Sequence, residues 1–166
     1  IHKLFENINI ETIKDFVSNQ QEENLNIEFK TIINSNFTDK NDRKNFAKCL
    51  SGFANSNGGI IVWGIDARKK QNGVDCASAI KEIENVNIFL SKLNEYTGEF
   101  VSPDVEGVLH KKVELSDDKG FIVTLIPESD SGPHIAKAGE DRYYKRSGDS
   151  FYRMEHFDLE DMFGRR

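Results

Sequence analysis

The apolar run over residues 60–65, Ile-Ile-Val-Trp-Gly-Ile, constrains the fold of this chain more than any other feature. The run is too short for an ordinary helix and follows the glycine pair Gly58-Gly59, which is typical of a central strand buried on both faces of a sheet. Asp66 comes directly after the run. We therefore expect the carboxylate of Asp66 at the edge of that sheet.

A second strand is predicted over residues 25–30. In this segment the apolar residues Leu25, Ile27 and Phe29 alternate with the polar residues Asn26, Glu28 and Lys30. Such an alternation indicates a half-buried strand, whose polar face carries Glu28 and Lys30 close together. Glu23 lies just before the strand, where a turn would bring its carboxylate toward Glu28.

A helix is predicted between these two strands. It begins near Thr38 or Asp39, either of which is a suitable N-cap, and ends at Asn57-Gly58-Gly59. Its apolar face is formed by Phe46, Ala47, Leu50, Phe53 and Ala54, while Arg43, Lys44 and Lys48 mark a basic face. The order strand, helix, strand predicts that the two strands are parallel neighbours.

The rest of the chain alternates between helical and strand patterns. The predicted elements are one helix or two short ones over residues 4–17, a turn over 71–74, a helix over 79–93, a hairpin of strands over 105–115 and 121–126, short strands over 134–137, 142–146 and 150–153, and a closing helix over 154–163. We therefore expect a mixed α+β (α/β) fold, with a mixed β-sheet flanked by helices and a C-terminal β-hairpin region.

The length and composition indicate one soluble globular domain. A chain of 166 residues is long enough for one core and too short for two, and 37% hydrophobic with 30% charged residues is ordinary for a soluble protein. No stretch approaches the roughly 18 apolar residues of a membrane span, so we expect no membrane partner and a cytoplasmic location. Because the first residue is Ile1, we expect residues 1–166 to be part of a longer protein.

Cysteine usage and net charge exclude several functions. Cys49 and Cys76 are too few for a disulfide framework and lack the spacing of a zinc site. The net charge of −6 argues against a surface that is basic throughout, as in many nucleic-acid-binding proteins. A local basic groove remains compatible with this charge.

Three carboxylates form one candidate site. Glu23, Glu28 and Asp66 would supply the hard oxygen ligands that Mg²⁺ or Mn²⁺ prefers, and such ions organise attack on phosphodiesters. Lys30 would then stabilise a phosphate or orient a nucleophile. Carboxylates beside strands are also common on solvated surfaces, so the spacing alone leaves both alternatives open.

A basic segment near the end of the chain forms a second candidate site. Residues 137–153 hold five basic residues, Lys137, Arg142, Lys145, Arg146 and Arg153, against the three acidic residues Glu140, Asp141 and Asp149. With the aromatic residues Tyr143 and Tyr144, this segment combines phosphate-binding cations with rings suited to bases. The alternative is an edge hairpin whose charges prevent pairing with other sheets.

Three pieces of the sequence, taken together, resemble the Schlafen AlbA-type domain. They are Glu23-x-x-x-x-Glu28-Phe29-Lys30, the run from Phe53 to Asp66, and Arg142-Tyr143-Tyr144-Lys145-Arg146-Ser147-Gly148. The resemblance covers about residues 23–150 and implies a mixed α/β fold that binds nucleic acid. Nuclease members of the family cut tRNA and other structured RNA with three carboxylates and a divalent metal, and these carboxylates correspond to Glu23, Glu28 and Asp66.

The resemblance implies a first functional hypothesis, a metal-dependent endoribonuclease. In this hypothesis Glu23, Glu28 and Asp66 bind Mg²⁺ or Mn²⁺ and are catalytic together with Lys30, and RNA is a more suitable substrate than DNA. The nucleic-acid-binding residues are Lys30, Arg142, Tyr144, Lys145 and Arg146. Nuclease Schlafen proteins use paired lobes, so a single lobe implies a homodimer or a partner domain outside this chain.

Two other hypotheses compete with the nuclease. The domain could be a non-catalytic DNA- or RNA-binding module of a transcriptional regulator or of a larger defence or signalling protein, with carboxylates that brace Lys30 or Arg146. It could also be an oligomerising or sensory domain without contact to nucleic acid.

Overall fold

The computed structural model describes residues 1–69 and 73–165, so the first half of the turn predicted over residues 71–74 lies outside the described residues. The described helices are α1 (His2–Asn7), α2 (Ile10–Ser18), α3 (Lys40–Ala54), α4 (Val86–Tyr96) and α5 (His156–Gly164). The described strands are β1 (Ile27–Lys30), β2 (Gly59–Trp63), β3 (Ile65–Lys69), β4 (Asp75–Ile80), β5 (Ile83–Glu84), β6 (Val101–Ser102), β7 (Leu109–Ser116), β8 (Lys119–Ile126), β9 (Ile135–Lys137), β10 (Asp141–Ser147) and β11 (Ser150–Arg153).

The main sheet is mixed, as the sequence predicts. Its strand order is β1-β2-β8-β5, and β7 also pairs with β8. β1 and β2 are parallel, with Glu28 opposite Ile61, which confirms the predicted unit of strand, helix and strand. β7 and β8 form the predicted antiparallel hairpin.

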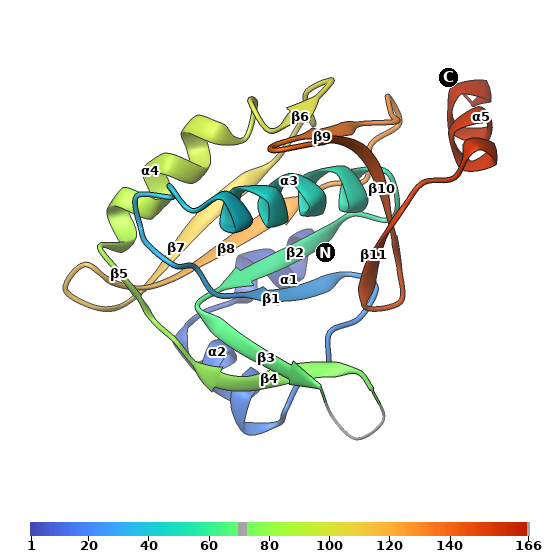
Figure 1. Ribbon diagram of the computed structural model, residues 1–166. Coiled ribbons are helices and arrows are strands. Elements are labelled where there is room, and N and C mark those ends of the chain that lie inside the picture. The colour runs from blue at the N-terminus through green and yellow to red at the C-terminus, as the bar shows by residue number, and fades with distance from the viewer. Residues whose placement is uncertain (70–72, 166) are drawn as a thin grey trace.

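Helices cover both faces of the main sheet, and β2 lies at its centre (Figure 1). Ile61 and Trp63 point into the core formed with α3 and α4, whereas Ile60 and Val62 point into the core formed with α1 and α2. All four side chains are almost fully buried. The predicted central strand is therefore confirmed, and so are the two short helices at the start of the chain.

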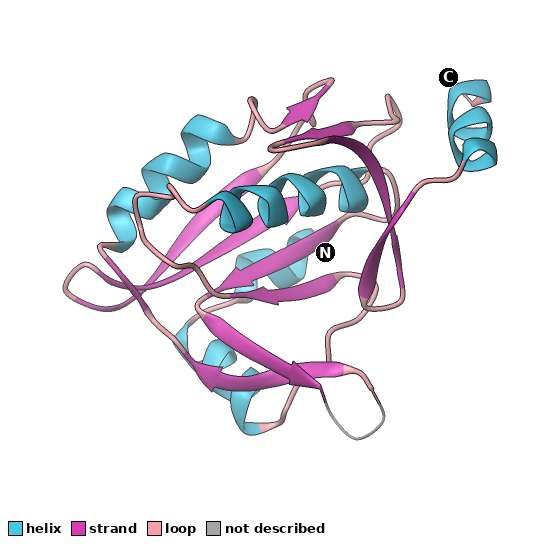
Figure 2. Ribbon diagram, in the orientation of Figure 1, coloured by secondary structure: helices cyan, strands magenta, loops and turns pink. Residues whose placement is uncertain are grey.

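A smaller sheet covers the opposite side of α3. It has the strand order β11-β10-β9-β6 (Figure 2). β9, β10 and β11 are the short C-terminal strands predicted from the sequence, whereas β6 was not predicted. Phe46 and Phe53 of α3 belong to the same core as Trp63 of the main sheet and as Ala136 and Tyr144 of the small sheet. α3 is therefore packed between two sheets, and β10 is held against it.

The helix predicted over residues 79–93 begins later than expected. Residues 75–80 form β4, which pairs with β3, and residues 83–84 form β5, which pairs with β8. The helix α4 starts only at Val86. Ile80 and Ile83 are three residues apart, a spacing that fits a helix, but these residues belong to two successive strands.

The strand predicted over residues 60–65 is interrupted at Gly64, directly after β2 ends at Trp63. Gly64 has φ = +113°, a backbone conformation that favours glycine, and the chain continues as the separate strand β3. Asp66 is therefore the second residue of β3 instead of following the end of a central strand. The prediction that β1 is half-buried is also wrong, because Glu28 on its polar face is only 6% exposed.

α5 lies apart from the sheets at the C-terminal end of the chain (Figure 1). It confirms the predicted closing helix but contains no buried residue. Within residues 1–69 and 73–165, none of the helices has the length and apolar character needed to cross a membrane.

Candidate nucleic-acid interface and acidic pocket

The three predicted carboxylates line one pocket beside β1. The pocket has a volume of about 250 Å³ and lies between β1, β3, the first turn of α3 and the start of β4. The charged residues that line it are Glu23, Glu28, Lys30, Asp42, Asp66 and Asp75. The structure thus brings Glu23, Glu28, Lys30 and Asp66 together, as the spacing in the sequence suggests.

Glu23 is buried, and its carboxyl group binds a proton more tightly than an ordinary glutamate does. The backbone N–H of Glu23 donates to the carbonyl of Asp75 at 2.9 Å, and its Oε2 accepts a hydrogen bond from the N–H of Phe29 at 2.9 Å. Burial, together with the nearby Glu28 carboxylate, raises the pKa of Glu23 to about 8. Near neutral pH the Glu23 carboxyl therefore carries a proton.

Glu28 is bound to two cations. Its Oε2 lies 2.9 Å from Nη1 of Arg146, and its Oε1 lies 3.6 Å from Nζ of Lys30. Because the side chain of Glu28 is 8% exposed, both contacts form in a region largely shielded from water. The negative charge of Glu28 is therefore balanced by Arg146 and Lys30 inside the protein.

Arg146 is an internal residue. Its side chain is 0% exposed, and its Nη2 donates to the carbonyl oxygens of Asn24 at 2.6 Å and Ile27 at 2.9 Å. The guanidinium also lies over the rings of Phe53 and Phe151, with 5.0 and 4.6 Å to their centroids. The guanidinium therefore faces Glu28 and the β1 backbone, and it is not presented to a ligand in solvent.

The carboxylates have the chemistry of hard-metal ligands, but their arrangement does not fit a divalent cation. Oε2 of Glu23 accepts the N–H of Phe29, Glu28 is paired with Arg146 and Lys30, and Oδ2 of Asp66 lies 3.2 Å from Nε of Arg68. Over residues 1–69 and 73–165, no three Asp, Glu, His or Cys side chains are placed so that they could hold one metal ion. This conformation supports the alternative that the carboxylates brace cationic side chains.

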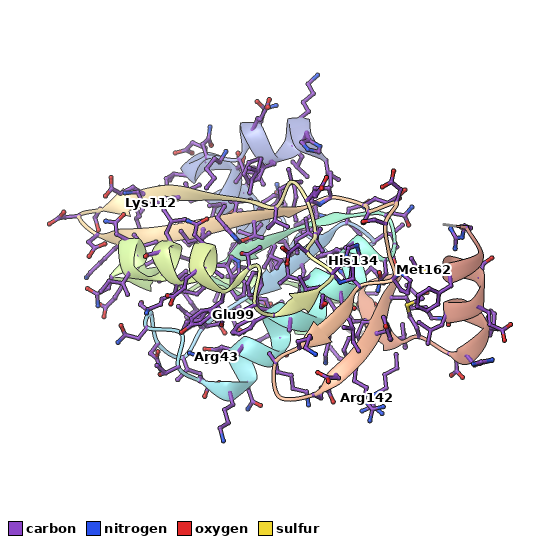
Figure 3. The ribbon with its side chains drawn as sticks, turned by 90° about the horizontal axis from the view of Figure 1, so that it is seen from above. Arg43, Glu99, Lys112, His134, Arg142 and Met162 are labelled. Carbon is purple, nitrogen blue, oxygen red and sulfur yellow. The ribbon has the colours of Figure 1, made fainter. Side chains whose placement is uncertain are left out.

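A cluster of cations lies on another face of the domain, where β10 crosses α3. We call Lys44 and Lys48 of α3, Arg142 of β10 and Arg153 of β11 the basic cluster. The ammonium of Lys48 lies over the ring of Tyr144, 5.4 Å from its centroid. In Figure 3, Arg142 points away from the body of the protein, and Lys112 lies at the opposite edge.

One carboxylate lies among these four cations. Oε1 of Glu140 is 3.8 Å from Nζ of Lys44, and its Oε2 is 3.8 Å from Nε of Arg142. Tyr144 donates a hydrogen bond from its hydroxyl to Glu140. This hydrogen bond and the charges of Lys44, Arg153 and Arg142 lower the pKa of Glu140, which therefore stays ionised.

The other basic residues predicted to contact nucleic acid are distributed differently. Successive residues of β10 point to opposite faces. Tyr144 points toward α3 and is 5% exposed, whereas Lys145 points toward α5 and lies 3.0 Å from Oδ2 of Asp158. Only Arg142 of the predicted nucleic-acid-binding residues therefore belongs to the basic cluster.

The sequence predicts Lys44 and Lys48 on the basic face of a helix, but they were not among the residues predicted to bind nucleic acid. The two lysines lie four residues apart on the predicted basic face of the helix, and residues with this spacing point the same way. What the sequence did not supply is the packing of β10 and β11 across α3, which brings Arg142 and Arg153 to them.

A comparison with protein families identifies the family of the chain. Residues 23–155 match the family described as Schlafen, AlbA_2. The chain therefore belongs to the Schlafen AlbA_2 family, as its motifs suggested. A search of curated proteins gave no match.

Two solved structures share the fold. One is the N-terminal domain of a protein from Nitrosomonas europaea named for its relation to the ATP-dependent DNA helicase RecG, with a TM-score of 0.57 and 20% identity over 90% of this chain and 96% of that one. The other is the DIP2311 protein from Corynebacterium diphtheriae, with a TM-score of 0.50 and 13% identity over 88% of this chain and 26% of that one. At these identities the two structures support the fold alone.

Proposed function

We propose that this domain binds nucleic acid through the basic cluster, without catalysis. The observation that carries the proposal is the convergence of four cations, from α3, β10 and β11, on one face of a chain with a net charge of −6. Membership of the Schlafen AlbA_2 family supports it, because the resemblance implies nucleic-acid binding.

The chemistry of the basic cluster favours contacts to the phosphate backbone. Lysine and arginine side chains bind phosphate oxygens, which positions a protein on nucleic acid without reading its sequence. The ring of Tyr144 is buried beneath Lys48, so that its face is not free to stack on a base. We therefore expect binding that is sensitive to salt and tolerant of sequence.

Binding of fluorescently labelled single-stranded DNA, single-stranded RNA and duplexes, followed by anisotropy at low salt, tests the proposal. Arg142→Ala and Lys44→Ala should each weaken binding roughly three- to ten-fold, because each removes a phosphate-binding cation. Lys112→Ala on β7 is the matched control, since Lys112 lies away from the cluster and binds Asn87. Absence of binding at low salt would contradict the proposal and favour an oligomerising or sensory domain. Equal effects of all three substitutions would contradict a binding site at the basic cluster.

A metal-dependent endoribonuclease is a second candidate, favoured by one observation. Glu23, Glu28 and Asp66 line the same pocket as Lys30, although in the present conformation they do not fit a cation. For this function Glu23 would have to lose its proton and Glu28 would have to leave Arg146. A homodimer or a partner domain would supply a second lobe to hold the RNA.

Incubation of the protein with tRNA, rRNA and single-stranded DNA in the presence of Mn²⁺ or Mg²⁺ decides between the two candidates. Cleavage that disappears in both Glu28→Ala and Asp66→Ala would establish the nuclease. Unfolding curves of both variants should be recorded, because Glu28→Ala leaves the buried Arg146 without its carboxylate partner. Cleavage that persists in both folded variants would come from a contaminant or another site.

A further inference from the structure

We propose that the Glu140 carboxylate occupies the position at which the basic cluster takes a phosphate of nucleic acid, so that Glu140 competes with the ligand and limits its affinity. This inference rests on the proposed nucleic-acid-binding function. It adds a specific phosphate site to that function and a residue that regulates the site.

The surroundings of Glu140 are those of a bound phosphate oxygen. Its two carboxylate oxygens face the ammonium of Lys44 and the guanidinium of Arg142, each at 3.8 Å, and one of them accepts the hydroxyl hydrogen of Tyr144. Cations and hydroxyl donors of this kind bind phosphate oxygens as readily as carboxylate oxygens. The site is therefore suited to either anion.

One carboxylate does not neutralise the cluster. Glu140 carries a single negative charge, whereas Lys44, Lys48, Arg142 and Arg153 carry four positive charges. The ammonium of Lys48 faces the Tyr144 ring instead of Glu140. An anion with more oxygens than a carboxylate, such as a phosphodiester within a charged backbone, would match the cluster better.

The position of Glu140 in the chain allows its side chain to move away from Lys44 and Arg142. It follows Gly139 in the short turn between β9 and β10. The Glu140 side chain is 20% exposed, and its two ion pairs are longer than a hydrogen bond. Partly exposed ion pairs of this length are weak, and a phosphate oxygen can accept the Tyr144 hydroxyl hydrogen in place of Glu140, so a phosphate can displace the carboxylate.

Asp141, the next residue, provides a matched control. Its Oδ1 lies 3.5 Å from Nζ of Lys137, at the exposed side of the same turn. Asp141→Asn therefore removes the same charge as Glu140→Gln, at a neighbouring position, without changing the basic cluster. Glu140→Gln keeps an oxygen that can accept the Tyr144 hydrogen bond, and we expect the variant to fold.

The test compares the affinity of both variants for labelled single-stranded DNA and RNA over a range of salt concentrations. Glu140→Gln should bind roughly three- to ten-fold more tightly than the unsubstituted protein, with a salt dependence steeper by about one phosphate contact. Asp141→Asn should change the affinity less than two-fold, because its exposed carboxylate pairs with Lys137 outside the basic cluster. Equal effects of the two substitutions, or unchanged affinity of Glu140→Gln, would overturn the inference while leaving nucleic-acid binding intact.

A second readout separates this inference from the proposed function. The side-chain Nε–H resonance of Arg142 is followed by NMR during titration with sodium pyrophosphate. A shift at lower pyrophosphate concentration in Glu140→Gln than in Asp141→Asn supports the phosphate site, even if neither variant binds nucleic acid. That combination would contradict the proposed function alone, and equal titrations of the two variants would overturn the phosphate site.

Discussion

Arg146 of β10 forms an ion pair with Glu28 of β1 across 118 residues of sequence, with 2.9 Å between Nη1 and Oε2. The same guanidinium donates to the carbonyl oxygens of Asn24 and Ile27, at the start of β1. One side chain therefore connects the small C-terminal sheet to the edge of the main sheet. In the motif at residues 142–148, the buried Arg146 connects the two sheets, whereas Arg142 lies at the surface.

Substitution of Arg146 should destabilise the domain strongly. In Arg146→Ala the Glu28 carboxylate loses its partner at 2.9 Å and keeps Lys30 at 3.6 Å, and the carbonyls of Asn24 and Ile27 lose the guanidinium donor. Removal of one partner from a buried ion pair costs about 3 to 5 kcal/mol. Urea unfolding followed by circular dichroism measures this loss.

Arg142→Ala is the control for that substitution, because it removes the same type of side chain from the same strand. Arg142 is half exposed and lies 3.8 Å from Glu140, so its loss should change the free energy of unfolding by only about 0.5 kcal/mol. Similar losses for the two variants would show that the Arg146 contacts do not stabilise the fold.

The periodicity of apolar residues and the order of the elements were sufficient to predict much of the main sheet. The buried strand at residues 60–63, the parallel pairing of β1 with β2 and the hairpin of β7 and β8 were all predicted. The start of α4 was not, because Ile80 and Ile83 satisfy helical spacing while lying in strands that pair with distant partners.

The candidate site was predictable only in part, for a physical reason. Alternation along residues 25–30 predicts that Glu28 and Lys30 share a face, and they lie 3.6 Å apart. Whether that face meets solvent or another sheet depends on where residues 141–153 pack. Arg146 packs over Glu28, and the Glu28 carboxylate pairs with this buried cation. The spacing of residues 25–30 cannot reveal that contact, because Arg146 is distant in the sequence.

The stability of the domain should depend on the protonation of Glu23. An unfolded glutamate titrates near its ordinary pKa of 4.5, whereas the folded Glu23 titrates near 8 because it is buried and faces Glu28. The folded state therefore holds the proton more tightly, and the stability associated with it is present below pH 4.5 and is lost as the pH rises toward 8. We expect a loss of about 1 to 3 kcal/mol.

Glu23→Gln removes this dependence, because glutamine resembles the protonated acid. The variant should match the unsubstituted protein near pH 5 and exceed its unfolding free energy near pH 8.5. Glu11→Gln, on the exposed side of α2, is the control and should leave the difference between the two pH values unchanged. Parallel pH profiles for the unsubstituted protein and Glu23→Gln would contradict the assignment of the titrating group to Glu23.

Asn55, at the end of α3, should be essential for the attachment of the small sheet. Its Nδ2 donates to the carbonyls of His134 at 3.0 Å and Tyr144 at 2.9 Å, and its Oδ1 accepts the N–H of His134 at 2.8 Å. Asn55→Ala removes all three hydrogen bonds and leaves the Ser51 hydroxyl, at 2.7 Å, as a donor to the His134 carbonyl. We expect a loss of about 2 to 4 kcal/mol in unfolding free energy. Asn57→Ala, in the same motif, should cost less than about 0.5 kcal/mol because its side chain is exposed.

The salt dependence of nucleic-acid binding should report how many cations of the basic cluster contact phosphates. Each phosphate contact contributes about 0.7, for single strands, to 0.9, for B-DNA, to the slope of log affinity against log salt concentration. The double variant Lys44→Ala with Arg142→Ala should therefore reduce the slope by about 1.4 to 1.8. Lys112→Ala with Lys119→Ala, which removes two cations from the β7–β8 hairpin, should leave the slope unchanged. A slope that falls equally in both double variants would show that the protein binds through diffuse charge, without a defined interface at α3 and β10.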